Sequence, residues 1–285
     1  PPLVEELAPK VARKTPLLKT EWPLWNGTES QAEYAERAGI REWKLTLEIA
    51  RTAFPERPPA DWKFEPVTMS FVLIPAGTFR MGLSDDGVAS VRTARKQDPL
   101  DRMPYWFYVE KAFLLNSQPQ HEVTIKRPFY MAVDETSLIH HHAVFGLAGG
   151  ARDIPPTRHE STHFKAVAFC RKVAAFTDLR ARLPTEAEWE YACRAGSTGV
   201  WGASDTTDGL GKTVNFGQVG GRLDLRIGRL PANAWGLRDV LGNCWEWCGN
   251  FMDRPFTARP YTDLQTPDYD RWNDECYNFD WLEKN

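Results

Sequence analysis

Three carboxylates stand at alternate positions in the segment 184–191: Glu186, Glu188 and Glu190. Carboxylates clustered in this way can serve as a general acid and a general base. The same residues would follow the N-cap of a helix, where glutamates interact favourably with the helix dipole and satisfy the cap without any catalysis. We therefore expect a structural role for the three glutamates.

Three adjacent histidines, His140, His141 and His142, are a second candidate site. On an extended segment alternate side chains point to the same face, so His140 and His142 could bind one metal ion. Such a site normally needs a third ligand held by supporting hydrogen bonds. The sequence does not place His159 or His163 beside them. We therefore interpret the three histidines as a solvent-exposed turn.

The chain has five cysteines, an odd number, so at least one is a free thiol or pairs with another chain. Cys170 and Cys193 lie in predicted helices among apolar neighbours, where buried thiols are expected. Cys244 and Cys248 would share one face of a strand, but strand residues four apart are generally too distant for a disulfide bond. Cys276 stands apart, near the end of the sequence.

Two helices are predicted to carry several of these groups. In the segment 165–176 apolar side chains recur at positions i, i+3, i+4 and i+7, which is typical of an amphipathic helix. A second helix begins after Thr185, which forms a capping box with Glu188. Gly196 lies where the C-terminal cap of that helix belongs.

Other elements are predicted less sharply. A helix is expected around 28–50, beginning at the capping box of Ser30 and Glu33. The segment 69–81 suggests two short strands in a hairpin, and further strands are expected at 121–125 and 128–131. The connection 83–120 is a long loop that mixes charged and aromatic residues, and loops of this length are often functional.

Four segments occur in a fixed order along the chain: 71–82 (FVLIPAGTFRMG), 182–192 (RLPTEAEWEYA), 231–237 (PANAWGL) and 242–247 (GNCWEW). Together they resemble the formylglycine-generating (sulfatase-modifying factor) family, whose domain is a variant of the C-type lectin fold. The resemblance implies an α+β, C-type-lectin-like and loop-rich fold, in which the helix after Thr185 is scaffold.

The resemblance also implies a calcium ion at the turn that the last segment matches. Calcium takes about six to eight oxygen ligands from carboxylates, amides and main-chain carbonyls. The implied ligands are the Glu246 carboxylate and the main-chain carbonyls of Leu241, Gly242 and Cys244, with Asn243 adjacent. The alternative is that Asn243 and Glu246 only bond the backbone of a tight turn.

A second calcium position in relatives corresponds to the segment 214–216. Asn215 is the candidate ligand there, since its side-chain oxygen could bind the ion. The nearest acidic residue is Asp224, and its spacing does not fit.

The family's oxidation chemistry uses copper on two cysteine thiolates, in a C-terminal segment that follows an Arg-Gly-Gly-Ser-like strand. Thiolates are soft ligands that select Cu(I). After Trp247 the sequence has no Arg-Gly-Gly-Ser, and Cys276 is the one cysteine after Cys248. We therefore expect no copper and assign no catalytic residue. A related branch, which joins sulfur to histidine derivatives on an iron ion, is not expected because no histidine precedes His121.

We expect three parts in the chain: an N-terminal arm packed on the domain (1–65), a formylglycine-generating-enzyme-like domain (66–255) and an aromatic and acidic tail (256–285). The tail's aromatic residues include Tyr261, Tyr269, Trp272, Tyr277, Phe279 and Trp281. Aromatic side chains at this density are expected either to cover the domain or to form a surface for a partner.

Net charge of −3 and a pI of about 6.1 argue against a nucleic-acid partner. No apolar run approaches the roughly 20 residues that cross a bilayer, so a transmembrane protein is not expected. The sequence begins with Pro1 rather than Met, and relatives in the family are often exported. We therefore expect a periplasmic or secreted protein, with a trimmed boundary as the alternative explanation.

The leading hypothesis is an exported, non-catalytic binding or assembly protein with structural calcium, or a subunit of a larger complex. Its partner would be another protein or protein complex. The alternative is a metal-dependent oxidase of the same family acting on a protein cysteine or another substrate, which turnover of a Cys-x-Pro-x-Arg peptide would reveal.

Overall fold

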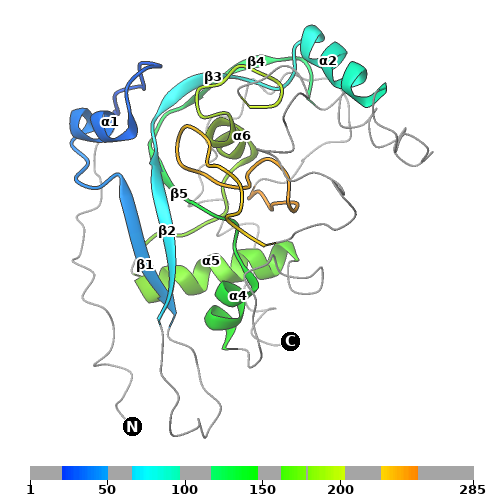
Figure 1. Ribbon diagram of the computed structural model, residues 1–285. Helices are drawn as coiled ribbons and strands as arrows, with labels where there is room; N and C mark the ends of the chain where they lie inside the picture. The colour runs from blue at the N-terminus through cyan, green and yellow to red at the C-terminus, as the bar shows by residue number, and fades with distance from the viewer. Residues whose placement is uncertain are drawn as a thin grey trace, which may run out of the picture.

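The computed structural model describes residues 21–50, 66–96, 117–146, 162–177, 179–202 and 226–249. The strands in these ranges are β1 (Lys44–Ala50), β2 (Val67–Ile74), β3 (Gly77–Met81), β4 (His121–Ile125) and β5 (Phe129–Ala132). The helices are α1 (Gln31–Ala38), α2 (Asp85–Lys96), α4 (Leu138–Phe145), α5 (His163–Thr177) and α6 (Glu186–Arg194). The α+β, loop-rich class is confirmed (Figure 1).

The strands of the described residues form two small antiparallel sheets. The first has the order β1-β2-β5, and the second pairs β3 with β4. β2 and β3 therefore run into different sheets, and the predicted hairpin over 69–81 is wrong. The tight two-residue turns that close hairpins need a residue with positive φ. Pro75 and Ala76, which join the two strands, both lack it.

The expectation of one helix over 28–50 is also wrong in its second half. The capping box of Ser30 and Glu33 forms as predicted, but α1 ends after Ala38 because Gly39 takes a left-handed C-cap (φ 71°). Lys44–Ala50 then becomes β1, and Leu45 lies opposite Phe71 of β2. Residues 31–50 thus contribute a helix and a strand to the same packed unit as β2.

The long connection 83–120 does not begin as a loop. Its first part forms α2, with Asp85 and Asp86 in the first turn, where carboxylates favour the helix dipole. Residues 97–116 lie outside the described ranges. In the parts of the chain that the structure describes, we find no helix long and apolar enough to cross a membrane.

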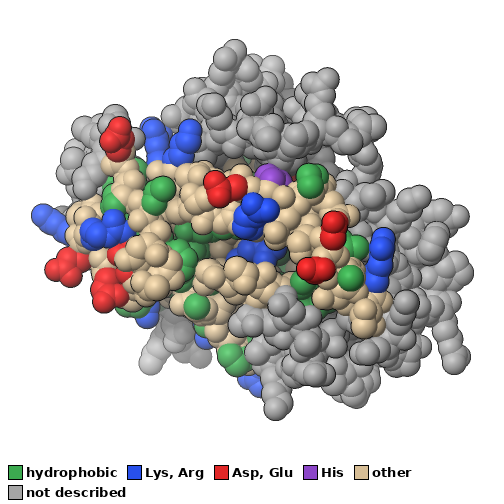
Figure 2. All heavy atoms as spheres, turned by 90° about the horizontal axis from the view of Figure 1, so that it is seen from above, with side chains coloured by type: hydrophobic (Ala, Val, Ile, Leu, Met, Phe, Trp, Pro, Cys, Tyr) green, Lys and Arg blue, Asp and Glu red, His purple; other side chains and the backbone are tan. Residues whose placement is uncertain are grey.

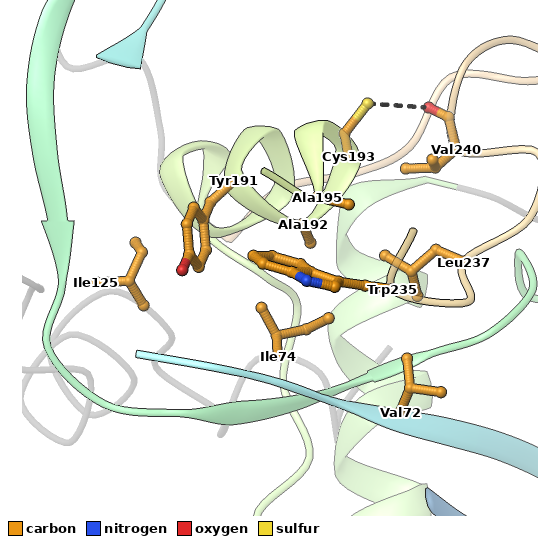
Figure 3. Packing of buried hydrophobic residues seen from close by; sticks show 10 residues of the cluster. All are labelled: Val72, Ile74, Ile125, Tyr191, Ala192, Cys193, Ala195, Trp235, Leu237 and Val240. Atoms are coloured by element: carbon orange, nitrogen blue, oxygen red, sulfur yellow. Dashed lines mark hydrogen bonds between the residues drawn. The ribbon is translucent and has the colours of Figure 1, made fainter. Parts of the chain in front are cut away.

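The largest core cluster lies between α6 and the strands (Figure 3). Trp235 is 3% exposed and sits beneath α6, with its ring 4.8 Å from that of Tyr191 in an edge-to-face arrangement. A second cluster packs α4 and α5 against β1 and β2 through buried residues that include Ile49, Met69, Val144, Phe169 and Val173. A third packs α1 against β2 through Tyr34 and Leu73.

The face seen from above shows Lys and Arg side chains interspersed with Asp and Glu (Figure 2). Neither charge sign dominates that view of the described residues.

Residues near the N-terminus of the described chain close the main core. The Trp25 backbone N–H donates to the Ala76 carbonyl (2.6 Å), and its ring lies 5.3 Å from that of Trp235. At the end of α6, Ala195 takes the left-handed cap and Gly196 follows with φ 84°. A Cβ on Gly196 would lie 2.5 Å from the Trp25 indole, so only glycine fits there.

We expect Gly196→Ala to lower the free energy of unfolding by about 2–3 kcal/mol, because it adds overpacking to the strain of positive φ. Gly27→Ala is the matched control, since Gly27 also has positive φ (90°) but a Cβ there would meet nothing within 4 Å. Gly27→Ala should lower the free energy of unfolding by about 1 kcal/mol. Urea denaturation of both variants measures the difference. Equal destabilisation would contradict the packing of Trp25 against the end of α6.

Candidate cation-binding turn

The turn formed by residues 241–246 has a backbone that depends on its residue types. Gly242 and Asn243 both have positive φ, 114° and 52°. Glycine adopts this region without strain, and asparagine tolerates it better than most residues. The turn lies next to α6, because the Gly249 N–H donates to the Pro184 carbonyl (2.8 Å) just before that helix.

Glu135 holds the turn from the other side. It is 8% exposed and lies between β5 and α4, far from the turn in sequence. Its carboxylate accepts hydrogen bonds from the Asn243 side-chain amide, from the Cys244 backbone N–H (3.3 Å) and from the Cys244 thiol (3.2 Å). Burial raises the pKa of Glu135, while the donors on Asn243 and Cys244 act to lower it.

Glu246 points inward from the same turn. One of its carboxylate oxygens accepts a hydrogen bond from the Trp189 indole N–H of α6 (3.0 Å). Burial, followed by the neighbouring Glu135 charge, raises the pKa of Glu246 to about 8, and Asp239 adds to the rise. Asp239 is itself 5% exposed and accepts from the Gly228 backbone N–H. Three carboxylates therefore share one largely enclosed neighbourhood.

Enclosed carboxylates that repel one another are stabilised by a hard cation, and oxygen is the ligand that calcium prefers. In the described ranges no group of three or more His, Cys, Asp and Glu side chains is close enough to hold an ion alone. Main-chain carbonyls of the turn would have to supply the remaining ligands. The Asn243 side-chain amide donates to Glu135.

The structure brings the predicted residues Leu241, Gly242, Asn243, Cys244 and Glu246 together in one turn. Asn215 and Asp224, the second predicted position, lie outside the described residues. Sequence reasoning missed Glu135 and Asp239. Glu135 sits in an irregular segment with no periodic pattern, and the signal that could have found it was an acidic residue just before the capped start of α4.

The three glutamates of α6 were predicted to be structural, and for two of them the contacts confirm it. Glu188 accepts from the Thr185 backbone N–H (2.9 Å) and from both terminal nitrogens of Arg182 (2.6 and 2.8 Å). Glu190 accepts from the Gly82 N–H (2.8 Å) and pairs with Arg194 (2.8 Å). These carboxylates cap α6 and join it to the end of β3.

The interpretation of 140–142 as a solvent-exposed turn is wrong, because these residues lie in α4. The Ser137 backbone N–H donates to the His140 ring (3.1 Å), so His140 takes the place of the usual glutamate in a capping box. His141 is 5% exposed and packs 4.6 Å from the Phe145 ring. Side chains two apart on a helix do not face each other, so His140 and His142 cannot share an ion.

The four cysteines in the described ranges are all free: Cys170, Cys193, Cys244 and Cys248. Burial raises the pKa of Cys170, Cys193 and Cys248 to about 12 in each case. The Cys244 pKa is also raised, by burial and then by Glu135. Protonated thiols are poor nucleophiles. Cys276 lies outside the described residues.

Comparison with known proteins agrees with the motifs. Residues 156–261 match the model of the sulfatase-modifying factor enzyme 1-like domain. This segment is similar to that domain. The matched range holds three of the four ordered segments, 182–192, 231–237 and 242–247, and the resemblance is confirmed.

Among curated relatives, the formylglycine-generating enzyme of Thermomonospora curvata is 28% identical over 246 residues, which cover 72% of this chain and 77% of that enzyme. The formylglycine-generating enzyme of Mycobacterium tuberculosis is 44% identical over 77 residues, 23% of this chain and 26% of that enzyme. Hercynine oxygenase of the same organism is 33% identical over 147 residues, 47% of this chain and 30% of that protein. The chain thus spans less than a third of both Mycobacterium tuberculosis proteins.

Two solved structures are also similar. PvdO from Pseudomonas aeruginosa has a TM-score of 0.47 and 21% identity, covering 64% of this chain and 70% of that one. Treponema denticola variable protein 1 has a TM-score of 0.47 and 17% identity, covering 72% and 76%.

Without divalent cations, the free energy of unfolding should fall as pH rises from about 5 to 8, because folded Glu246 holds its proton up to about pH 8 and the unfolded residue loses it near 4.5. The contribution is on the order of 3 kcal/mol, discounted for partial exposure. Urea denaturation with a chelator, at several pH values, measures it.

Glu246→Gln should flatten this slope, since the amide does not titrate. Glu33→Gln is the control, because the Ser30 cap lowers the pKa of Glu33 and so cannot produce a fall over this range. If the wild-type protein with chelator showed the same dependence of unfolding free energy on pH as Glu246→Gln, the placement of Glu246 would be contradicted.

Proposed function

We propose that this chain is an exported binding or assembly protein, built on a formylglycine-generating-enzyme-like scaffold and partnered by another protein. Calcium at the turn of residues 241–246 would stabilise the scaffold rather than react. The observation that carries the proposal is that the side chains of residues 245–247 alternate between exposed and inward-facing. Glu246 is anchored inward on Trp189, whereas Trp245 and Trp247 are 82% and 47% exposed.

An exposed tryptophan on a fixed backbone suits recognition. Trp and Tyr dominate the binding energy of protein interfaces because they bury a large area at a small cost in side-chain entropy. The residues on both sides of Trp245 are held: the Cys244 backbone N–H donates to Glu135, and the Glu246 side chain accepts from Trp189. Trp245 is thus a pre-oriented anchor rather than a side chain on a loose loop.

The state of the thiols supports binding over oxidation. Copper oxidation of the kind the family performs needs two thiolates that meet at one metal ion. Cys193, Cys244 and Cys248 carry raised pKa values beside carboxylates, which disfavour the thiolate further. The Cys244 thiol donates its hydrogen bond to Glu135, so this thiol helps to hold the turn.

The test is affinity purification of the full chain and of Trp245→Ala from the native host, with bound proteins quantified by mass spectrometry. We expect at least one protein to be depleted about tenfold or more with Trp245→Ala, the loss of a typical interface hot spot. Leu24→Ala is the matched control, because Leu24 is also an exposed apolar residue (47%). Identical recovery by all three forms would overturn the proposal.

The relatives named formylglycine-generating enzyme favour one second candidate, an oxidase acting on a protein cysteine. The same purified chain, incubated with a Cys-x-Pro-x-Arg peptide, oxygen and copper, decides between the two. The binding proposal predicts a peptide of unchanged mass. Conversion of the cysteine to an aldehyde would establish the oxidase instead, and the Trp245→Ala comparison would still report on partner binding.

A further inference from the structure

The pair Asn26-Gly27 lies in the exposed turn that leads into α1, in dark blue in Figure 1. Asn26, Gly27 and Thr28 are all exposed, and a Cβ at Gly27 would meet nothing within 4 Å. Because glycine has no Cβ, the backbone nitrogen of Gly27 is an unhindered nucleophile beside the Asn26 side chain. The carboxamide carbon of Asn26 is the electrophile that this nitrogen can reach.

Three hydrogen-bond donors converge on the side-chain oxygen of Asn26. The backbone N–H groups of Thr28 and Glu29 donate to Oδ1 (2.9 and 2.8 Å), and the Thr28 hydroxyl donates to the same atom (3.2 Å). An oxygen that gains negative charge during a reaction is stabilised by donors that are already aimed at it. Attack on the Asn26 Cγ would place such a charge on Oδ1. The turn thus carries the donors of an oxyanion hole.

The neighbouring contacts hold this turn in one arrangement. The Asn26 backbone N–H donates to the Glu29 carboxylate (3.2 Å), which pairs with Arg37 of α1. The Trp25 indole N–H donates to the Glu29 carbonyl (2.8 Å), so the turn is closed across its two ends. Groups that are held in position react faster than groups that must first find each other.

We propose that Asn26 deamidates spontaneously in the folded protein. The Gly27 nitrogen forms a bond to the Asn26 Cγ, the bond from Cγ to Nδ2 breaks, and Nδ2 leaves as ammonia with the proton of the Gly27 N–H. Water then opens the cyclic imide. Its addition to the side-chain carbonyl gives aspartate, and its addition to the main-chain carbonyl gives isoaspartate. The reaction consumes water and no other reactant, so it does not depend on the proposed function or on Trp245.

The two products should differ in their effect on the core. Aspartate at position 26 offers the same three donors a charged acceptor, to which hydrogen bonds are stronger. Isoaspartate adds a methylene to the main chain inside the turn that Trp25 closes. The Trp25 ring packs against Trp235 and lies over Gly196, so isoaspartate should loosen the segment that closes the main core.

Asn233 provides a matched asparagine in the same chain. Its Oδ1 also accepts from two backbone N–H groups, at 3.0 Å each. Its Nδ2, however, donates to the Ala192 and Cys193 carbonyls (2.9 and 3.2 Å), and the next residue is Ala234. A leaving nitrogen held by two acceptors, followed by a residue with a side chain, opposes the reaction. Asn233 should therefore remain an amide under conditions in which Asn26 reacts.

The experiment incubates the purified, folded chain at mildly alkaline pH and follows its peptides by mass spectrometry. We expect the peptide with Asn26 to gain about 1 Da, as aspartate and isoaspartate, while the peptide with Asn233 keeps its mass. Thr28→Val removes one of the three donors and should slow the gain about three- to tenfold. Thr78→Val is the matched control, because the hydroxyl of this exposed threonine pairs with that of Thr124 (2.8 Å). It should leave the rate unchanged.

An Asn26 peptide of unchanged mass would overturn the proposal, and so would a rate that Thr28→Val does not alter. Asn26-Gly27-Thr28 also matches the acceptor pattern of N-glycosylation, so a glycan on Asn26 in the chain isolated from its native host would overturn it as well. The aspartate and isoaspartate forms, separated by ion exchange, are then unfolded in urea. We expect a lower midpoint for isoaspartate, and equal midpoints would contradict the loosening of the Trp25 segment.

Discussion

The Glu135 carboxylate joins two distant parts of this molecule. It leaves the chain between β5 and α4 and accepts from the Asn243 amide and from both donors of Cys244. Donors that lose their acceptor on burial cost about 1–3 kcal/mol each, so Glu135 is one of the side chains that stabilise the path of the turn. The charge of Glu135 also raises the pKa of Glu246, so the residue that holds the turn is part of an acidic site.

A second set of contacts fixes the turn against the core. The Asn233 side chain accepts from the backbone N–H groups of Trp235 and Leu237 (3.0 Å each) and donates to the Ala192 and Cys193 carbonyls near the end of α6 (2.9 and 3.2 Å). This places the Trp235 ring under α6, where it fills the main cluster. The loop 233–246 is thus held by side chains at both ends, which explains how an irregular segment can present Trp245 in a fixed direction.

The helix caps that depend on neighbouring residues were predictable from the sequence. The caps at Ser30 and Thr185 depend on residues three positions apart, and both formed as expected. The failures arose where partners are far apart in sequence. From the sequence alone, the segment 44–50 resembles a continuation of α1, but in the fold it is a strand that pairs with β2. His140 fills a capping position that normally holds glutamate, so the start of α4 was hidden.

The residues of the candidate site also differ in whether the sequence predicts them. Its turn residues were found by the motif at 242–247, whereas Glu135 was missed because a lone buried glutamate has no pattern until the fold brings it to Asn243. The motif therefore encodes the backbone of the turn and one carboxylate, Glu246, whereas the fold brings Glu135 and Asp239 beside it. A cation site on such a turn needs both, and this combination supports our assignment of a stabilising rather than a catalytic role.

The most direct test of this account is terbium luminescence, since Tb³⁺ replaces Ca²⁺ at oxygen sites and is excited through a nearby indole such as Trp189, which contacts Glu246. The account predicts luminescence on excitation of tryptophan that Ca²⁺ abolishes by competition and that is lost in Glu246→Gln but kept in Glu33→Gln. Luminescence that is absent, or that is unchanged by Glu246→Gln, would contradict a cation at this turn.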